Sequence, residues 1–190
     1  MKDERVDIVV IGGGAAGLMC AIEAGKRGRS VMVLEHADRI GKKIGISGGG
    51  RCNFTNIHAA PENFISASPD FCKSALARYT PRDFIAMVEK HDICYHKKKL
   101  GQLFCDFSSK QIIQLLLKEC DRAGVTIQLG CKVDSVQKEE RAFSVASNHG
   151  DFPCDSLVIA TGGLSIPKIG ATDFGYRMAE QFGLKVTERR

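Results

Sequence analysis

The alternation of apolar and polar positions divides the chain into strand-like and helix-like segments. Val6–Ile11 is a short apolar run, which is typical of a strand buried in a parallel sheet. A glycine cluster follows it, and Leu18–Lys26 then has the apolar spacing of a helix that stops just before Gly28. Ser30–Glu35 predicts a second buried strand that ends in an acidic residue. Together these segments predict an opening strand–helix–strand unit with a right-handed crossover.

The pattern beyond this unit first favours helices and then strands. Residues 36–56 have the composition of a loop, and residues 57–124 are predicted to be mainly helical. The expected helices are Pro69–Ala77, Pro81–Lys90 and Ser108–Ala123, and the expected short strands are Ile93–Tyr95 and Gln102–Phe104.

From Val125 onward the apolar period becomes two, which indicates strands. Residues 125–129 predict a strand parallel to the first two. Residues 131–154 predict a three-stranded antiparallel meander, with strands at Lys132–Val136, Ala142–Ala146 and Asp151–Cys154. A buried strand over Ser156–Ala160, a helix over Ala171–Phe182 and a final strand over Leu184–Thr187 complete the expected order.

The first glycine cluster carries the clearest chemical signal. Gly12, Gly14 and Gly17 fit the pattern G-x-G-x-x-G between a strand and a helix. In this pattern the first glycine permits a tight turn, the second admits a pyrophosphate, and the third lets the helix pack against the strand. Glu35 follows at about the distance, roughly 20 residues, at which a carboxylate accepts hydrogen bonds from ribose hydroxyls. It would repel a 2′-phosphate, which disfavours NADP. The alternative is a packing turn in which Glu35 is a solvated strand end.

A second glycine cluster, Gly48–Gly50, lies between Ser47 and Arg51–Asn53. Successive glycines destabilise regular structure and are tolerated where a ligand approaches the backbone. The cationic side chains of Lys42, Lys43 and Arg51 accompany this cluster, and this set suits a diphosphate or a polar ring edge. The alternative is a flexible surface loop with incidental charge.

Composition narrows the class of protein without fixing a function. The chain has 190 residues, of which 44% are hydrophobic and 26% charged, as expected for a soluble globular protein. No apolar run approaches the roughly 20 residues that span a bilayer, and Met1–Arg5 does not resemble a signal peptide, so a cytoplasmic location without membrane attachment is expected. The eight cysteines form no C-x-x-C pair, which supports neither a metal site nor a dithiol.

The net charge of +5 is mild and does not by itself indicate a nucleic-acid partner. The basic run His96–Lys99 could bind phosphate, although a solvated turn is the preferred interpretation. Basic residues are not interleaved with aromatic ones, so nucleic acid is not the expected partner. Oligomeric state and small-molecule substrate stay open.

The order of these elements resembles the FAD-binding domain of the glutathione-reductase superfamily, in which a β-meander serves as a crossover. Four segments narrow the resemblance: Gly41–Ile44, Ser47–Asn56, Phe71–Arg78 and Leu100–Asp106 look like the YhiN/BaiN family of FAD-dependent oxidoreductases, also labelled aminoacetone-oxidase-like. Members of that family are roughly twice as long.

The resemblance implies an α/β, Rossmann-like FAD-binding domain over residues 1–190, with a parallel sheet, a helical excursion and a meander. The family's second domain and C-terminal return segment are absent, so the domain is expected to be C-terminally incomplete. Val133 would contact the adenine through its backbone. Asp173–Phe174 departs from the glycine of many members and is not assigned to the cofactor. The candidate cofactor-binding residues are Gly12, Gly14, Ala15, Ala16, Gly17, Glu35, His36, Lys43, Ser47, Gly49, Gly50, Arg51, Cys52, Asn53, Val133, Ala160, Thr161, Gly162 and Gly163.

The expected activity is hydride or electron transfer by FAD on an unknown small molecule, with NAD(P)H as a candidate electron donor. No catalytic acid–base pair and no metal site are identified. Cys52 lacks a nearby partner cysteine, so a contact or packing role is favoured over a redox role. Two alternatives remain: a non-catalytic fragment that binds FAD or another dinucleotide, and, less favoured, an RNA-modifying flavoprotein.

Overall fold

The computed structural model describes residues 5–166 and 170–188. The chain forms two compact units, each described here by itself. The first consists of Met1–Lys43 and Leu116–Arg190, and the second of Ile44–Leu115. The chain passes between them within helix α2 (Lys42–Ile46) and helix α5 (Lys110–Arg122).

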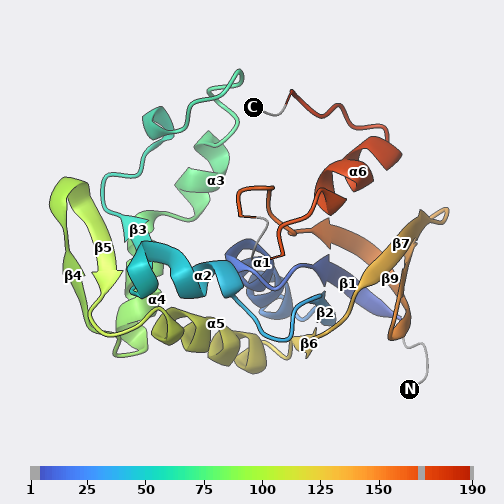
Figure 1. Cartoon of the computed structure of the whole chain (residues 1–190), viewed down its shortest axis with the longest axis horizontal. Helices are drawn as coiled ribbons and strands as arrows, with labels where there is room; N and C mark the ends of the chain where they lie inside the picture. Colours follow the sequence, from blue (N-terminus) through green and yellow to red (C-terminus); the bar gives the residue numbers. More distant parts are fainter. Residues whose placement is uncertain (1–4, 167–169, 189–190) are drawn as a thin grey trace. The chain divides into compact units, whose positions relative to one another are not determined.

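The first unit is built on a six-stranded sheet in the order β6-β2-β1-β9-β8-β7 (Figure 1). Its strands are β1 (Val6–Ile11), β2 (Val31–Leu34), β6 (Thr126–Gln128), β7 (Val133–Lys138), β8 (Phe143–Ser147) and β9 (Gly150–Ile159). The β6-β2-β1-β9 pairs are parallel, and the β9-β8-β7 pairs are antiparallel. In register, Val10 of β1 lies between Val33 of β2 and Val158 of β9. This mixed sheet confirms the expected Rossmann-like class.

Strand β9 corrects the sequence-based prediction of two separate strands over 151–154 and 156–160. It is one strand of ten residues that pairs with β8 in its first part and with β1 from Cys154 onward. The polar Asp155 suggests an interruption, but it is exposed and forms an ion pair with Arg5. Cys154 pairs with both neighbours and is fully buried, so the meander and the parallel sheet are continuous.

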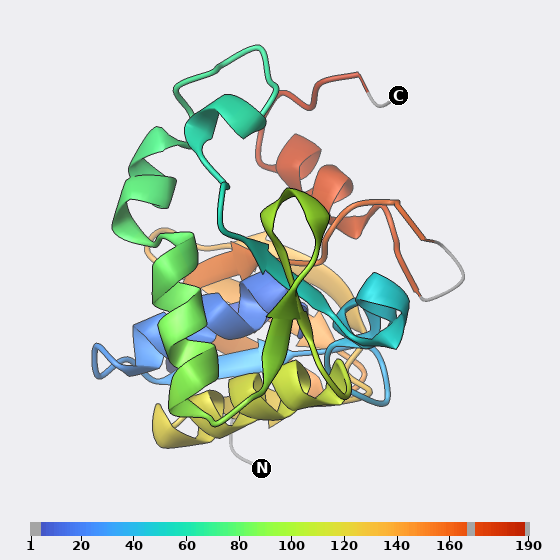
Figure 2. The same ribbon diagram turned by 90° about the vertical axis from the view of Figure 1, so that its left-hand side faces the viewer.

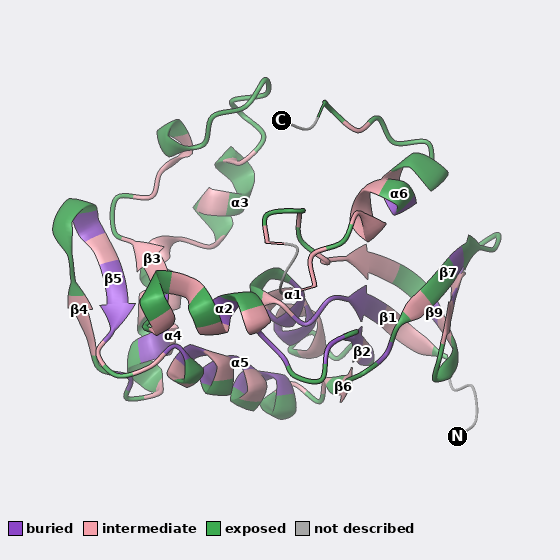
Figure 3. Cartoon of the chain, viewed as in Figure 1, coloured by how far each residue is buried: buried purple, intermediate pink, exposed green. Residues whose placement is uncertain are grey.

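Both faces of the central strands are covered, which explains why β1 is an apolar run. Successive residues of β1 face opposite sides: Val9 belongs to a cluster with Met178 of α6 (Phe174–Gln181), and Val10 to a cluster with Ala21 of α1 (Ala15–Gly25). Figure 3 shows β1 and β2 among the most buried elements. Helix α6 is shorter than expected, and residues 184–187 form no strand, contrary to the prediction.

The second unit contains a three-stranded antiparallel sheet in the order β3-β5-β4 and several short helices. Its strands are β3 (Asn53–Asn56), β4 (Tyr95–Lys97) and β5 (Gln102–Cys105). Its helices are α3 (Lys73–Arg78) and α4 (Pro81–Lys90), with 3-10 turns η1 (Ser47–Gly50), η2 (Pro61–Asn63) and η3 (Lys99–Gly101). Figure 2 shows β4 and β5 as a twisted hairpin.

The interpretation of residues 36–56 as a loop was wrong in part. The segment contains α2, η1 and β3, because Gly48 and Gly49 take the left-handed conformation, with φ of 57° and 66°, and turn the chain tightly between the helix and the strand. Helix α4 has its predicted bounds: Thr80 caps it, accepting from the Asp83 N–H, and proline occupies the first turn. Within residues 5–166 and 170–188, no helix has the length and hydropathy to cross a membrane.

Candidate functional site

The three glycines of the first cluster occupy different environments at the end of β1. Gly12 has φ of 112°, and a Cβ there would lie 2.5 Å from the carbonyl oxygen of Ala160. A Cβ on Gly17 would overlap the carbonyl oxygen of Gly12, so this glycine allows α1 to pack against the strand end. A Cβ on Gly14 would meet no atom within 4 Å. Two glycines are therefore required by packing, and the middle one borders open space, as expected for a pyrophosphate cradle.

Helix α1 begins at this open space. Gly14 is its N-cap, and no side chain caps the helix or places an acid in its first turn. The first N–H groups of an α-helix have no acceptor within the helix and carry the positive end of its dipole. Ala15 and Ala16 contribute only small apolar side chains there. The helix end therefore has the chemistry of an anion site.

Glu35 is buried against the glycine cluster instead of being a solvated strand end. The residue is 8% exposed, and its Oε2 accepts a hydrogen bond from the Gly13 N–H at 2.7 Å. Its Oε1 accepts from the Ala37 N–H at 2.8 Å, and His36 Nδ1 lies 3.1 Å from the same oxygen. Because each carboxylate oxygen has two lone pairs, Glu35 retains acceptor capacity for a ribose hydroxyl.

Main-chain hydrogen bonds bring the segment before β7 alongside Glu35. The N–H of Cys131 donates to the Glu35 carbonyl at 2.9 Å, and the N–H of Gly130 donates to the Ala37 carbonyl at 2.9 Å. Val133 is the first residue of β7 and pairs with Ser147, next to an irregularity in the ladder. Val133, the residue expected near the adenine, therefore begins the strand that follows Gly130 and Cys131.

The turn after β9 meets the glycine cluster from the other side. The N–H of Ala160 donates to the Ile11 carbonyl at 2.8 Å, and the positions of Gly12 and Ala160 crowd each other. Thr161 Oγ1 is buried and has no hydrogen-bond partner among the described residues. Gly162 has φ of 74° and faces open space. This turn lies at the carboxyl ends of parallel strands, which is where ligands bind in such sheets.

Two further predicted residues of the first unit lie in the connections around this edge. Lys43 Nζ donates to Ser165 Oγ at 2.7 Å. The half-exposed His36 ring lies close to Gly170, whose Cβ would come within 2.7 Å of His36 Nε2.

In the second unit, the predicted residues of the other glycine cluster surround η1. Ser47 Oγ donates to the Ile44 carbonyl at 2.7 Å, and Arg51 donates to the Asp106 carbonyl at 3.0 Å. Cβ atoms on Gly49 or Gly50 would meet no atom within 4 Å, so their backbone is accessible. Asn53 is exposed, and once its amide oxygen and nitrogen are exchanged, the NH2 group donates to the carbonyls of Thr55 and Leu103.

Cys52 is a buried thiol with a left-handed backbone, at φ of 52° and 5% exposure. Its N–H donates to the Ser47 carbonyl at 3.0 Å. Burial raises the pKa of the Cys52 thiol, although a hydrogen bond with Ser47 opposes the shift. Because the thiolate is the reactive form, Cys52 has the character of a packing residue.

The sequence patterns missed the residues that tie the first site together. Gly13 lies between the motif glycines and donates its N–H to Glu35, and a Cβ there would displace Ile40 Cδ1. Gly175 of α6 is similar, since a Cβ there would lie 2.8 Å from Thr161 Oγ1. The run of three successive glycines could have identified Gly13 from the sequence, whereas no sequence pattern marks Gly175.

Sequence comparison finds relatives over nearly the whole chain. The chain is 51% identical over 187 residues to a ribosomal RNA dihydrouridine synthase of Escherichia coli (strain K12), covering 98% of this chain and 47% of that protein. It is 48% identical over 186 residues to the protein of the same name from Haemophilus influenzae, covering 96% and 46%. A 3-dehydro-bile acid delta(4,6)-reductase of Clostridium scindens is 28% identical over 179 residues, covering 93% and 44%. The chain thus spans about half the length of these curated relatives.

Solved structures share the fold at low sequence identity. Glycine oxidase from Geobacillus kaustophilus aligns with a TM-score of 0.66 and 15% identity, over 96% of this chain and 59% of that one. L-proline dehydrogenase from P. horikoshii aligns with a TM-score of 0.65 and 14% identity, over 97% and 57%. The family model described as HI0933-like protein Rossmann domain matches residues 6–189. The chain therefore belongs to the HI0933-like family of Rossmann domains.

Proposed function

We propose that this chain is the FAD-binding part of an FAD-dependent oxidoreductase of the YhiN/BaiN type, and that its first unit binds the adenosine diphosphate half of FAD. The observation that carries the proposal is the arrangement of Gly14 and Glu35. Gly14 borders open space at the N-terminus of α1, and the Glu35 carboxylate lies one hydrogen bond from the neighbouring Gly13. N–H donors for a phosphate and a carboxylate acceptor for a ribose hydroxyl thus meet at one turn.

Each group in this turn has a distinct task in the proposal. The first N–H groups of α1 would bind the pyrophosphate, with no side chain at Gly14 to keep it away. Glu35 would accept a ribose hydroxyl, and its negative charge would repel a 2′-phosphate. Thr161 Oγ1, which lacks a partner among the described residues, is a candidate to bind the cofactor. When bound, FAD supplies hydride and electron transfer, while the chain supplies binding and orientation.

The Ser47–Asn53 loop of the second unit is assigned to the diphosphate and flavin region by family resemblance. Its accessible Gly49 and Gly50 backbone and the Arg51 guanidinium are suitable donors for such polar groups. The assignment of this loop, and of NAD(P)H as electron donor, remains a prediction.

Titration with pieces of the cofactor tests the proposal. FAD and ADP are expected to bind this chain and to compete with each other, whereas FMN, which lacks the adenosine, should not displace ADP. Gly14→Ala adds a methyl group in open space, and should weaken ADP and FAD binding by at least tenfold while the protein stays folded. Gly45→Ala is the matched control, because its Cβ would meet only Ile113 Cδ1 at an ordinary 3.8 Å. Failure of the chain to bind ADP and FAD, or wild-type affinity in Gly14→Ala, would refute the proposed site.

A second candidate concerns the substrate of the whole protein. The relatives that are 51% and 48% identical over nearly all of this chain are both named ribosomal RNA dihydrouridine synthases. Conversion of uridine to dihydrouridine adds two hydrogen atoms across the C5=C6 bond of uracil, and a reduced flavin is a suitable donor of the hydride. We therefore propose a uracil base of ribosomal RNA as the substrate, with a small molecule as the alternative.

Mass spectrometry of ribosomal RNA tests this second candidate. Cells that lack the gene encoding this chain should lose dihydrouridine from their ribosomal RNA, and a plasmid copy should restore it. A plasmid carrying Gly14→Ala should restore less. Unchanged dihydrouridine after deletion would refute the RNA substrate without affecting the proposal of FAD binding.

A further inference from the structure

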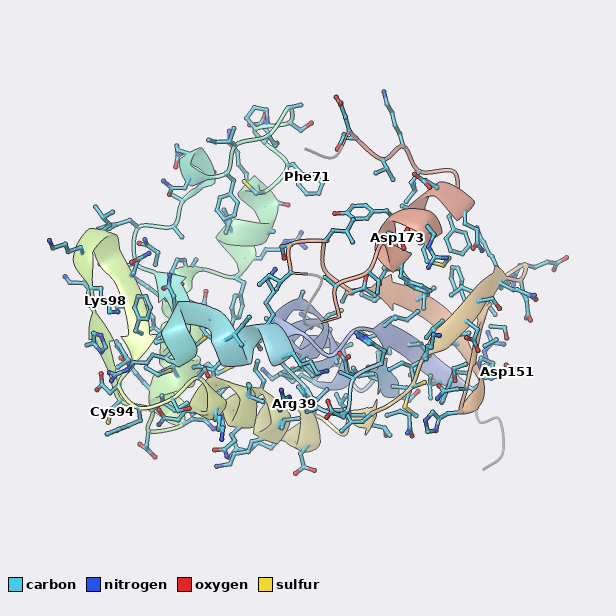
Figure 4. All side chains as sticks on the ribbon, viewed as in Figure 1. Arg39, Phe71, Cys94, Lys98, Asp151 and Asp173 are labelled. Atoms are coloured by element: carbon cyan, nitrogen blue, oxygen red, sulfur yellow. The ribbon has the colours of Figure 1, made fainter. Side chains whose placement is uncertain are left out.

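We propose that the turn between β4 and β5 is an RNA-docking element, in which Lys97, Lys98 and Lys99 contact phosphates and Leu100 contacts a base or sugar. The inference rests on the second candidate function, an RNA substrate. It concerns only the second unit. Figure 4 labels Lys98 on this hairpin, and Figure 3 shows the turn in the colour of exposed residues.

The turn concentrates positive charge. Lys97, Lys98 and Lys99 are consecutive and exposed, and no acidic residue occurs between Tyr95 and Cys105. Within residues 5–166 and 170–188, none of the three lysines has a carboxylate partner at salt-bridge distance. Asp106, the first acid after β5, pairs with His96, whose Nδ1 lies 2.7 Å from its Oδ1. The charge of the turn is therefore available to an anionic partner.

The turn is also held rigidly, so its groups are pre-organised. The Asn56 side-chain amide donates to the Leu100 carbonyl at 2.9 Å, and the Ile57 N–H donates to the Gly101 carbonyl at 3.0 Å. The Lys98 N–H donates to the Gln102 carbonyl at 2.8 Å, which closes the hairpin. Gly101 has φ of 79°, and a Cβ there would overlap the His58 ring. Pre-organisation lowers the entropic cost of binding.

Leu100 is the feature that packing inside the protein does not explain. It has φ of 61° and ψ of 22°, a left-handed conformation that is an outlier for a bulky side chain. The side chain is 85% exposed, so the unit gains almost no apolar burial from it. Strained residues of this kind concentrate where a segment binds a ligand. The turn thus presents an apolar side chain at a fixed point beside three cations.

The side chains beneath the turn stabilise its cationic face. Lys98 Nζ lies 4.0 Å from the centroid of the Phe104 ring, and the His96 ring stacks on Phe104 at 6.2 Å with an interplanar angle of 19°. A cation above an aromatic face is attracted to its quadrupole, which orders the lysine without neutralising it.

RNA fits this surface better than a lipid bilayer does, because a single apolar side chain offers little area for insertion and phosphates of RNA match closely spaced lysines.

The test measures binding of this chain to a fluorescent RNA hairpin with a uridine-rich loop over a range of salt concentrations. Each lysine–phosphate contact contributes about 0.7–0.9 to the slope of log K against log salt. Replacement of Lys97, Lys98 and Lys99 together by Gln should therefore reduce the slope by about 2–3. The matched control replaces Lys118, Lys138 and Lys185 by Gln, which removes the same charge from other exposed positions of the chain.

Leu100→Gly provides an independent test of the apolar contact. Glycine relieves the left-handed strain, so the melting temperature should stay equal or rise, while RNA affinity falls several-fold with an unchanged salt slope. Equal losses in the two triple-lysine variants, or no RNA binding by the wild-type chain, would overturn the proposal. So would a variant of Lys97–Lys99 or Leu100 that alters binding only to phosphatidylglycerol vesicles. FAD affinity is measured in parallel. Absence of FAD binding by the wild-type protein would refute the proposed cofactor, whereas the RNA measurements test the docking turn independently.

Discussion

Replacement of Glu35 by Gln should destabilise the first unit even in the absence of any cofactor. The carboxylate accepts hydrogen bonds from two buried backbone donors, the Gly13 N–H at 2.7 Å and the Ala37 N–H at 2.8 Å. Glutamine has the same shape but only one acceptor oxygen, so its NH2 group must face one of these donors.

The magnitude follows from the two hydrogen bonds. A hydrogen bond to a charged group contributes about 1.5–3 kcal/mol, and a buried donor left without a partner costs about 1–3 kcal/mol. Because these contributions overlap, Glu35→Gln should lower the free energy of unfolding by about 2–4 kcal/mol. At a urea m-value of about 2 kcal/mol/M, the unfolding midpoint should fall by roughly 1–2 M.

Urea titrations at neutral pH without cofactor, followed by circular dichroism, provide the measurement. Glu23→Gln is the control in the same unit, because Glu23 lies on the exposed side of α1, and its ion pairs among the described residues are those with Lys26 and Arg27. Exposed pairs contribute little, so its free energy of unfolding should fall by about 0.5 kcal/mol or less. Amide hydrogen exchange should accelerate at Gly13 and Ala37 in Glu35→Gln alone. A midpoint equal to that of Glu23→Gln would refute the structural role of this carboxylate.

Three further outcomes are expected. Gly17→Ala should prevent stable folding, because its Cβ would overlap a main-chain oxygen. Gly14→Ala should lower the free energy of unfolding by only about 1 kcal/mol, as expected for an N-cap. Thermal melts distinguish the two outcomes. Burial raises the pKa of the Cys105 and Cys120 thiols from 9.0 to about 11. The stability that these thiols contribute is therefore complete below pH 9 and is lost as the pH rises to 11. Cys120→Ala should make the decline of the urea midpoint at alkaline pH less steep. Thr80→Ala should cost about 1 kcal/mol through loss of the α4 cap, and Thr80→Ser, which keeps the hydroxyl, should cost less in the same titration.

Elements specified by local chemistry were predictable from the sequence. The opening strand–helix–strand unit follows from an apolar run, spaced glycines and a second apolar run, which act within neighbouring turns of the chain. Helix α4 has its predicted bounds because Thr80 and Pro81 both define its start. These signals depend on contacts between residues close in sequence, so no knowledge of the fold is needed to read them.

Features set by distant partners were not predictable. Strand β9 continues through Asp155 because β1 and β8 pair with it from two sides, and neither partner is visible in the local pattern. Leu184–Thr187 has strand-like residues but finds no partner strand among the described residues. Likewise, the motif predicts a ribose contact for Glu35, whereas the hydrogen bonds that its carboxylate accepts from the Gly13 and Ala37 N–H groups depend on the fold.

The two glycine clusters show why motif spacing alone does not identify ligand-facing positions. Gly12 and Gly48 are crowded by neighbouring atoms, as is Gly13, although all three belong to triplets that look alike in sequence. Gly49 and Gly50 border open space, but their positive φ means that any side chain strains the backbone as well as filling the space.

Gly14 differs from the other five glycines of these triplets. Its backbone, at φ of −84° and ψ of −174°, accepts an alanine, and its Cβ direction is open. A methyl group at this position therefore changes access to the N-terminus of α1 far more than it changes the fold. Cofactor binding by Gly14→Ala consequently separates the ligand-binding role of the motif from its packing role, which substitutions at Gly12 or Gly17 would combine.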